Sequence, residues 1–341
     1  MEQKPATIKQ IAKRLNVSAS TVSRALHNHP SIGLRTRMQV KNLATELDYE
    51  PNQAAISFKK GKTFTLGVIL PNLGEEFFSM AINSIEDTAS KNNYIVLVGQ
   101  SHDDKEREKK IVETMRKHRV DGIIVSISKN TDSFEHFDDL KKYKIPVVFF
   151  DRVPDGNDVY KISCSLKQCS IAMVDWLVSK EHKRIGFIKG PSSMTSTDER
   201  MQGYIQGLAK NNIKMDSNLI VETDLTTTQN IAAMKKLLAL KEIPPAVIVF
   251  NDYVALDAIK YTKGRGYKIN KDIYFASYAN LPITTYLDDP PIVSVEQFPH
   301  EQAEKATEIL LKLIDTKNFP GEIKNKIVLE SKLVLNQKEN K

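Results

Sequence analysis

A short stretch near the N-terminus combines small hydroxyl-bearing residues with a single arginine at helical spacing. Ser18 follows a turn at Asn16 and Val17 and can cap a helix whose buried stripe includes Val22 and Ala25. The outward positions of that helix are Ala19, Ser20, Ser23 and Arg24. Small residues let a helix enter the major groove of DNA, and an arginine can then reach a guanine edge or a phosphate. The pattern makes this a candidate DNA-recognition helix, and a short amphipathic helix with a solvated surface arginine is the alternative interpretation.

Two more helices are needed to hold a recognition helix, and the sequence supplies both. Thr7 and Gln10 form a capping box before a helix with apolar positions at Ile8, Ile11, Ala12 and Leu15. A third helix is expected near Thr36, with inward positions at Val40, Leu43, Ala44 and Leu47. The three apolar stripes can close a small core around a helix-turn-helix.

The excess positive charge of the chain lies in this region. Residues 1–62 contain eleven Lys or Arg and four Asp or Glu, and subtraction from the totals of 49 and 42 leaves 38 of each elsewhere. A basic module on an electrically balanced body favours binding of a polyanion by the module and a separate role for the body.

The rest of the chain alternates short apolar strands with helices, in two series. The strands are FTLGVIL, YIVLVG, GIIVSI and IPVVFF, then RIGFIK, NLIVET, AVIVF and IYFAS. Helices are expected near 77–91, 104–118, 133–142, 198–212, 228–240, 253–264 and 300–314, and one closing strand in KIVLESKLVL. Such strands predict parallel sheets covered on both faces. The expected fold class is α/β, with two doubly wound parallel-sheet lobes after a small all-α domain, and chain crossings between the lobes near 162, 293 and 323.

Polar side chains follow several strands, at the edge where open α/β sheets bind ligands. The main candidates are Asp151, Arg200, Asn251 and Gln297. A carboxylate and a guanidinium together can bracket hydroxyl groups through charge-assisted hydrogen bonds. Other interpretations stay open at this point: Asp151 with Arg152 as an exposed turn pair, Arg200 as a solvated helix charge, and Asn251 or Asp252 as a helix cap.

The sequence lacks the common motifs of catalysis and cofactor binding. It contains no G-x-x-x-x-G-K-[ST] loop, no G-x-G-x-x-G after a strand, no G-x-S-x-G and no H-E-x-x-H. The two cysteines, Cys164 and Cys169, have no histidines at metal-ligand spacing. We therefore expect no enzymatic activity, cofactor or metal. Apolar runs stay below the ~18 residues of a membrane span, and the first residues lack a signal peptide's apolar region, so we expect a cytoplasmic protein without a membrane partner.

The run TIKQIAKRLNVSASTVSRALHNHPSI, continued by TRMQVKNLATELDYEPN, resembles the DNA-binding domain of the LacI/GalR family of bacterial transcription regulators. The resemblance implies a helix-turn-helix domain over 1–50 that contacts double-stranded operator DNA. The implied contact residues in this domain are Thr7, Ser18, Ala19, Ser20, Thr21, Ser23, Arg24 and His27.

Residues 51–62 resemble the hinge helix of the same family, which forms on DNA and inserts a leucine into the minor groove. The implied DNA contacts are Asn52, Ala55 and Phe58. Phe58 stands at the leucine position and Ile56 at a usual arginine position. An aromatic ring can still act as an apolar wedge between base steps. A flexible basic linker carrying Lys59, Lys60 and Lys62 is the alternative.

Residues 63–341 resemble the periplasmic-binding-protein-like effector and dimerisation domain of the family. The implied effector contacts are Phe77, Phe78, Asp151, Arg200, Leu225, Asn251 and Gln297. Two positions depart from the family: Ala279 replaces an aspartate that binds sugar hydroxyls in many members, and Met194 replaces an arginine of the purine-binding members.

The resemblance implies a homodimeric transcription regulator, a repressor controlled by a small-molecule effector that is expected to be a sugar or sugar derivative. A nucleobase or nucleoside effector is the alternative within this class. A solute-binding protein for transport would have no use for the basic head, and an enzyme with a DNA-binding appendage would need a nucleophile or metal set that the sequence lacks.

Overall fold

The computed structural model describes residues 6–50, 61–156, 158–315 and 324–336. The chain divides into two compact units, residues 1–63 and residues 64–341, which we call the head and the body. Among the described residues, no helix is both long and apolar enough to cross a membrane.

The head contains three helices around a small core. They are α1 (Ile8–Arg14), α2 (Ala19–Leu26) and α3 (Leu34–Glu46). The predicted capping box is confirmed, because the backbone N–H of Thr7 donates to Gln10 Oε1 at 2.7 Å and that of Gln10 donates to Thr7 Oγ1 at 3.3 Å. The core side chains are Ile11, Ala12, Val22, Ala25, Val40 and Ala44. The third helix begins at Leu34, slightly before the predicted start.

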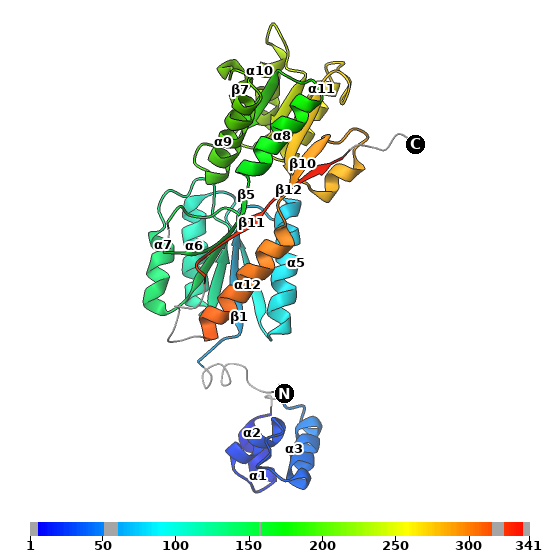
Figure 1. The fold of residues 1–341 in the computed structure, drawn as a ribbon. Coiled ribbons are helices and arrows are strands. Elements are labelled where there is room, and N and C mark those ends of the chain that lie inside the picture. The colour runs from blue at the N-terminus through cyan, green and yellow to red at the C-terminus, as the bar shows by residue number, and fades with distance from the viewer. Residues whose placement is uncertain (1–5, 51–60, 157, 316–323, 337–341) are drawn as a thin grey trace. The chain divides into compact units, whose positions relative to one another are not determined.

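The body has two lobes, each built on a six-stranded sheet covered by helices on both faces (Figure 1). The predicted α/β fold of two doubly wound lobes is confirmed. The first sheet is all parallel in the order β11-β5-β4-β3-β1-β2. The second, β12-β10-β9-β8-β6-β7, is parallel except for β12, which pairs antiparallel with β10.

The first lobe contains β1 (Thr65–Leu70), α5 (Glu76–Lys91), β2 (Ile95–Gln100), α6 (Lys105–Lys117), β3 (Gly122–Val125), α7 (Glu135–Asp138), the 3-10 helix η1 (Asp139–Tyr143), β4 (Val147–Phe150), β5 (Tyr160–Ser165), α12 (Pro299–Asp315) and β11 (Lys326–Glu330). The second lobe contains α8 (Lys167–Ser179), β6 (Ile185–Lys189), α9 (Thr195–Lys210), η2 (Ser217–Leu219), β7 (Ile220–Glu222), α10 (Thr227–Leu238), β8 (Ala246–Val249), α11 (Asp252–Lys263), β9 (Tyr274–Ala279), η3 (Pro282–Tyr286), β10 (Val293–Glu296) and β12 (Lys332–Leu335).

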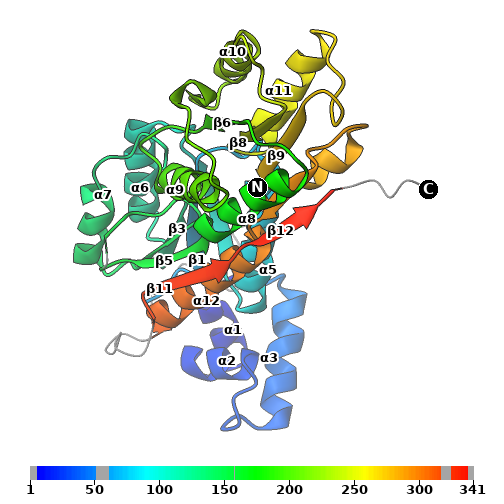
Figure 2. The same ribbon diagram turned by 45° about the horizontal axis from the view of Figure 1, so that its top comes forward.

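The prediction of a single closing strand in KIVLESKLVL is wrong, because the segment forms two strands. Its first half, β11, joins the first sheet beside β5, and its second half, β12, joins the second sheet beside β10. The chain changes lobe at Ser331, whose Oγ donates to the carbonyl oxygen of Ser165 at 2.5 Å. Figure 2 shows the two strands running end to end across both lobes. The other crossings lie between β5 and α8 and between β10 and α12.

The predicted helix at 133–142 is also shorter than expected, because only Glu135–Asp138 is α-helical before η1. One helix, α8, was not predicted. It packs closely on α9, and glycine is required there: a Cβ at Gly203 would lie 2.4 Å from the Cβ of Ser170, and one at Gly207 would lie 2.6 Å from the Cβ of Val174. This contact helps fix the start of α9, which carries Arg200.

Candidate functional site

The recognition helix α2 presents the face that the sequence predicts. Ser18 caps the helix, since its Oγ accepts from the backbone N–H of Thr21 at 3.1 Å. Ala19, Ser20, Arg24 and His27 are exposed, and Thr21 and Ser23 are half-buried. His27 Nδ1 lies 2.8 Å from the carbonyl oxygen of Ser23 at the end of the helix. Thr7 is exposed at the start of α1. Asn52, Ala55 and Phe58 lie outside the described residues.

In the body, two adjoining cavities of about 70 and 40 Å³ lie at the C-terminal ends of the strands. Both are lined by Asp151, Arg152, Met194, Ser196 and Gln297, so they form one site, which we call the cleft. The smaller cavity is also lined by Phe77, Phe78, Arg200 and Asn251. The structure thus brings six of the seven predicted effector contacts together. Met194 and Ala279, the two departures from the family pattern, line the cleft as well.

Leu225 is the exception, because the residues that line either cavity do not include it. Its backbone is left-handed (φ 72°) and its N–H donates to Thr223 Oγ1 at 3.1 Å. This turn directs the side chain against the apolar core of the second lobe. Leu225 therefore does not lie where it could contact an effector in the cleft.

Arg200 is a buried cation, not a solvated helix charge. Its residue is 4% exposed, and its guanidinium lies 4.1 Å from the ring centre of Phe250 and 4.6 Å from that of Tyr278. Nη2 donates to Gln297 Oε1 at 3.3 Å, whereas Nε and Nη1 are buried without an acceptor among the described residues. Burial lowers the pKa of Arg200 to about 10. Buried donors without partners are costly, so a ligand that offers acceptors here is bound favourably.

Asp151 faces the same space from the first lobe. Its backbone is left-handed (φ 58°), and its N–H donates to Ile162 O at 3.0 Å and to Gln302 Oε1 at 3.2 Å. Burial raises the pKa of its carboxyl to about 6, against the opposing effect of Arg152 and Arg200. The interpretation of Asp151 and Arg152 as an exposed turn pair is wrong. The side chain of Arg152 is 9% exposed, and its Nη1 donates to Asp103 Oδ1 at 2.7 Å.

Asn251 is the cap of α11, since its Oδ1 accepts from the backbone N–H of Val254 at 3.0 Å. The neighbouring Asp252 is fully buried and does not cap the helix. Its carboxylate accepts from Ser277 Oγ and, at 2.6 Å, from the backbone N–H of Leu281. Asp252 thereby holds the turn after β9, where Ala279 and Asn280 are left-handed.

Sequence reasoning missed much of the lining of the cleft. The residues missed include Ser128, Lys129, Cys164, Ser193, Phe250 and Tyr253. Most follow β3, β6 and β8, so the rule that ligands bind at the carboxyl ends of strands could have found them.

Direct hydrogen bonds join the two lobes on both sides of the cleft. On one side, Lys129 Nζ donates to Asp224 O at 2.7 Å and Ser193 Oγ donates to Lys129 O at 2.7 Å. On the other, the N–H of Glu76 donates to Tyr253 Oη at 2.8 Å, and Glu76 Oε2 accepts from the N–H of Ile283 at 2.9 Å. The lobes are therefore closed on each other.

Two family models match the chain. The model described as periplasmic binding protein domain matches residues 66–318, and the model described as bacterial regulatory proteins, lacI family, matches residues 7–52. The HTH-type transcriptional repressor CytR of Escherichia coli (strain K12) is 30% identical over 310 residues, which cover 91% of this chain and 90% of that protein. Catabolite control protein A of Priestia megaterium is 29% identical, with 93% and 95% covered.

Solved structures share the fold. The Lac repressor dimer bound to operator and the anti-inducer ONPF aligns with a TM-score of 0.84 at 24% identity, over 97% of this chain and 98% of that one. The transcriptional regulator CelR in complex with cellobiose aligns with a TM-score of 0.72 at 22% identity, over 97% and 98%. With a matched lacI-family head, a matched binding-protein body and repressors among its full-length relatives, the chain belongs to the lacI family of bacterial regulatory proteins and is a DNA-binding transcriptional repressor.

Proposed function

We propose that this repressor responds to a sugar or sugar derivative that binds in the cleft between the two lobes. The observation that carries the proposal is Arg200, a buried guanidinium with two donors that lack an acceptor among the described residues. The carboxylate of Asp151 lines the same cleft. An acceptor facing Arg200 and a donor facing Asp151 are both supplied by hydroxyl groups on neighbouring carbons of one ring.

Aromatic rings complete the site. Phe77, Phe78, Phe250 and Tyr253 line the smaller cavity, and the apolar face of a sugar ring packs well on such surfaces. The cellobiose complex of CelR, which shares the fold, supports a carbohydrate. Aromatic rings also suit a nucleobase, which is the alternative effector. Ala279 offers no carboxylate. Among the acidic residues that line the cleft, which include Glu75 and Glu199, we assign hydroxyl recognition to Asp151, because it lines both cavities.

The proposal assigns a separate role to each part of the chain. Residues 1–50 read operator DNA through α2, residues 51–62 link the head to the body, and residues 63–341 bind effector and dimerise. Since operator DNA is the partner, the place of action is the bacterial cytoplasm. The contacts assigned to DNA are Thr7, Ser18, Ala19, Ser20, Thr21, Ser23, Arg24 and His27 in the head, and Asn52, Ala55 and Phe58 in the linker.

A homodimer is part of the proposal. β2 is an edge strand of the first sheet, and it exposes apolar side chains: Ile95 is 69% exposed, and Leu97 and Val98 are 37% and 38% exposed. An edge strand with exposed apolar residues needs a cover, and a second copy supplies the same surface in return. Two heads then read two half-sites one helical turn apart.

A thermal-shift screen tests the effector class. The purified protein is heated with sugars, sugar phosphates, nucleosides and nucleobases in turn, because a ligand that binds the folded state raises the melting temperature. We expect a sugar to stabilise the wild type and to have no effect on Arg200→Ala. Stabilisation by nucleobases alone would replace the sugar with the alternative. Stabilisation of both proteins by the same ligand would place the site elsewhere.

A further inference from the structure

The body concentrates positive charge at the edge of the first sheet where its strands begin. This edge comprises the last helical turns, the loops and the strand starts at 88–95, 114–122, 139–147, 158–160, 312–315 and 324–326. These segments contain ten Lys or Arg and four Asp or Glu. Residues 64–341 as a whole are balanced at 38 of each, once the 11 and 4 of the head and linker are subtracted from 49 and 42. The edge therefore carries a net positive charge, and the rest of the body carries a net negative charge.

The densest part of this edge is formed by residues 116–119 and 141–144, which we call the basic corner. The guanidinium of Arg116, at the end of α6, lies 4.5 Å from the ring centre of Tyr143 in η1, so the two basic segments are side by side. Lys117, Lys141 and Lys142 have side chains that are 64%, 69% and 75% exposed. Their partners in ion pairs are Glu113, Asp138 and Asp139, three or four residues earlier in the chain. Exposed pairs of this kind contribute little to stability and exchange readily for a phosphate.

The basic corner adjoins the point where the chain enters the body from the head. The backbone N–H of Phe64 donates to Asp121 Oδ2 at 2.8 Å, and the N–H of Asp121 donates to Thr65 O at 2.8 Å. Asp121 follows Arg119 by two residues. In Figure 1 this is the end of the first lobe at which β1 starts. Thirteen residues, 51–63, join this point to the three-helix part of the head, and at ~3.6 Å per residue they span at most about 47 Å.

We propose that the basic corner binds the phosphate backbone of the DNA that the head holds. The 13-residue linker ties the head, with the duplex it binds, to the chain entry point beside the corner, and a duplex carries one negative charge per ~1.7 Å of its axis. Tethering raises the effective concentration of phosphate at the corner, so a few exposed lysines are sufficient for a useful contact. The contact adds sequence-independent affinity on DNA that flanks the segment read by the recognition helices.

The test compares operator fragments of two lengths. A duplex selected from a random pool by the wild-type protein is prepared as a 20-bp core and as a 50-bp fragment with the same centre. The variant carries Lys141→Gln, Lys142→Gln and Lys144→Gln, all at exposed positions. We expect its affinity for the 50-bp fragment to fall about tenfold and the slope of log affinity against log salt to become shallower by about 2, since each phosphate contact contributes about 0.9. On the 20-bp core the loss should stay below about twofold.

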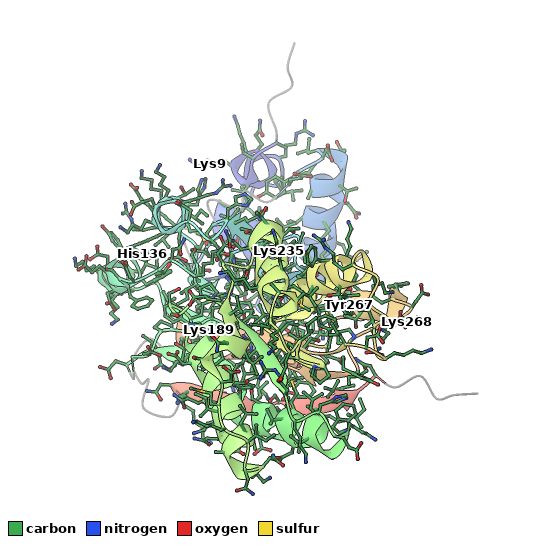
Figure 3. All side chains as sticks on the ribbon, turned by 90° about the horizontal axis from the view of Figure 1, so that it is seen from above. Lys9, His136, Lys189, Lys235, Tyr267 and Lys268 are labelled. Atoms are coloured by element: carbon green, nitrogen blue, oxygen red, sulfur yellow. The ribbon has the colours of Figure 1, made fainter. Side chains whose placement is uncertain are left out.

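The control variant removes the same charge from the second lobe, through Lys235→Gln, Lys236→Gln and Lys241→Gln at exposed positions. Lys235, on α10, is labelled in Figure 3. We expect it to bind both fragments like the wild type. A loss of equal size in the control, or wild-type affinity of the first variant for the 50-bp fragment, would overturn the proposal. A loss of equal size on both fragment lengths would overturn the placement on flanking DNA.

A further variant is expected to change DNA affinity in the opposite direction. Asp138→Asn with Asp139→Asn releases Lys141 and Lys142 from their ion pairs without removing a cation. We expect this protein to bind the 50-bp fragment about threefold more tightly, with an unchanged affinity for the core. Unchanged or weaker binding of the longer fragment would count against a phosphate contact at the basic corner.

Discussion

The carboxylate of Glu76, in the first turn of α5, accepts a hydrogen bond of 2.9 Å from the backbone N–H of Ile283 in the other lobe. The N–H of Glu76 donates to Tyr253 Oη in the same lobe as Ile283. One residue of the first lobe therefore holds the second lobe at two points, beside the cleft and in contact with its Tyr253 wall.

Glu76→Ala is expected to loosen the closed lobes, because it removes the acceptor of the Ile283 amide. Hydrogen exchange in peptides that cover η3 should become about tenfold faster, which corresponds to a loss of about 1.4 kcal/mol in local stability. Glu86→Ala, an exposed position on the same helix, is the control and should leave this exchange unchanged. Equal exchange in Glu76→Ala and wild type would mean that the other cross-lobe bonds suffice.

Arg24→Ala should weaken operator binding by about ten- to a hundredfold, since a good arginine contact to a base contributes about 1–3 kcal/mol. The head should keep its fold, because Arg24 is exposed. Lys41→Ala, also exposed but on α3, removes the same charge and should cost much less. Electrophoretic mobility shift on a selected operator measures both. Equal losses would reduce Arg24 to a general electrostatic role.

Arg200→Met should stabilise the ligand-free protein while abolishing the effector response. The substitution removes a buried cation that leaves Nε and Nη1 without acceptors among the described residues, a cost of about 1–3 kcal/mol. Arg152→Met is the opposite case, because it leaves the mostly buried carboxylate of Asp103 without its 2.7 Å partner and should destabilise. Urea unfolding of both variants measures this contrast. A destabilised Arg200→Met would show that the guanidinium is satisfied in solution.

The pH dependence of stability should carry the signature of Asp151. Burial raises its pKa to about 6 from 3.8, so the folded protein binds a proton more tightly than the unfolded chain does. The contribution of Asp151 to the free energy of unfolding is fully present below about pH 4, and it is lost as the pH rises through about 6. Asp151→Asn should therefore gain in unfolding free energy relative to wild type between about pH 4 and 7. A difference that stays flat over this range would show that Asp151 titrates normally.

Glu108→Ala should cost several kcal/mol. Glu108 is fully buried on α6, and its carboxylate accepts from Ser128 N–H at 2.7 Å, Ser128 Oγ at 2.9 Å and Thr131 Oγ1 at 2.9 Å. His136, labelled in Figure 3, has its Nε2 3.0 Å from the same carboxylate. Buried donors without an acceptor cost about 1–3 kcal/mol each. Glu106→Ala, whose partner Lys109 is exposed, should change the midpoint of denaturation little.

Most elements with periodic apolar residues were predictable, α8 being an exception, and the site was predictable in part. The starts of the first two helices could be predicted from Thr7 and Ser18, because helix capping depends on residues close in the sequence. Asp151 and Arg200 were found because they follow strands, but the burial of Arg200 depends on Phe250 and Tyr278, which come from distant parts of the chain. The break at Ser331 was hidden for the same reason: both halves of KIVLESKLVL are good strands, and only their partners in different sheets separate them.

The split of this last segment between the two sheets affects the order in which the protein can be completed during synthesis. β11 and β12 are edge strands of the two sheets, and α12 packs on the first lobe, yet all three lie after residue 298. The contacts of β11 with β5 join residues more than 160 positions apart. The head is made before the body and needs only local contacts, whereas neither lobe is complete until β11 and β12 have left the ribosome. A nascent or truncated chain would thus carry a DNA-reading head before it has a finished effector switch.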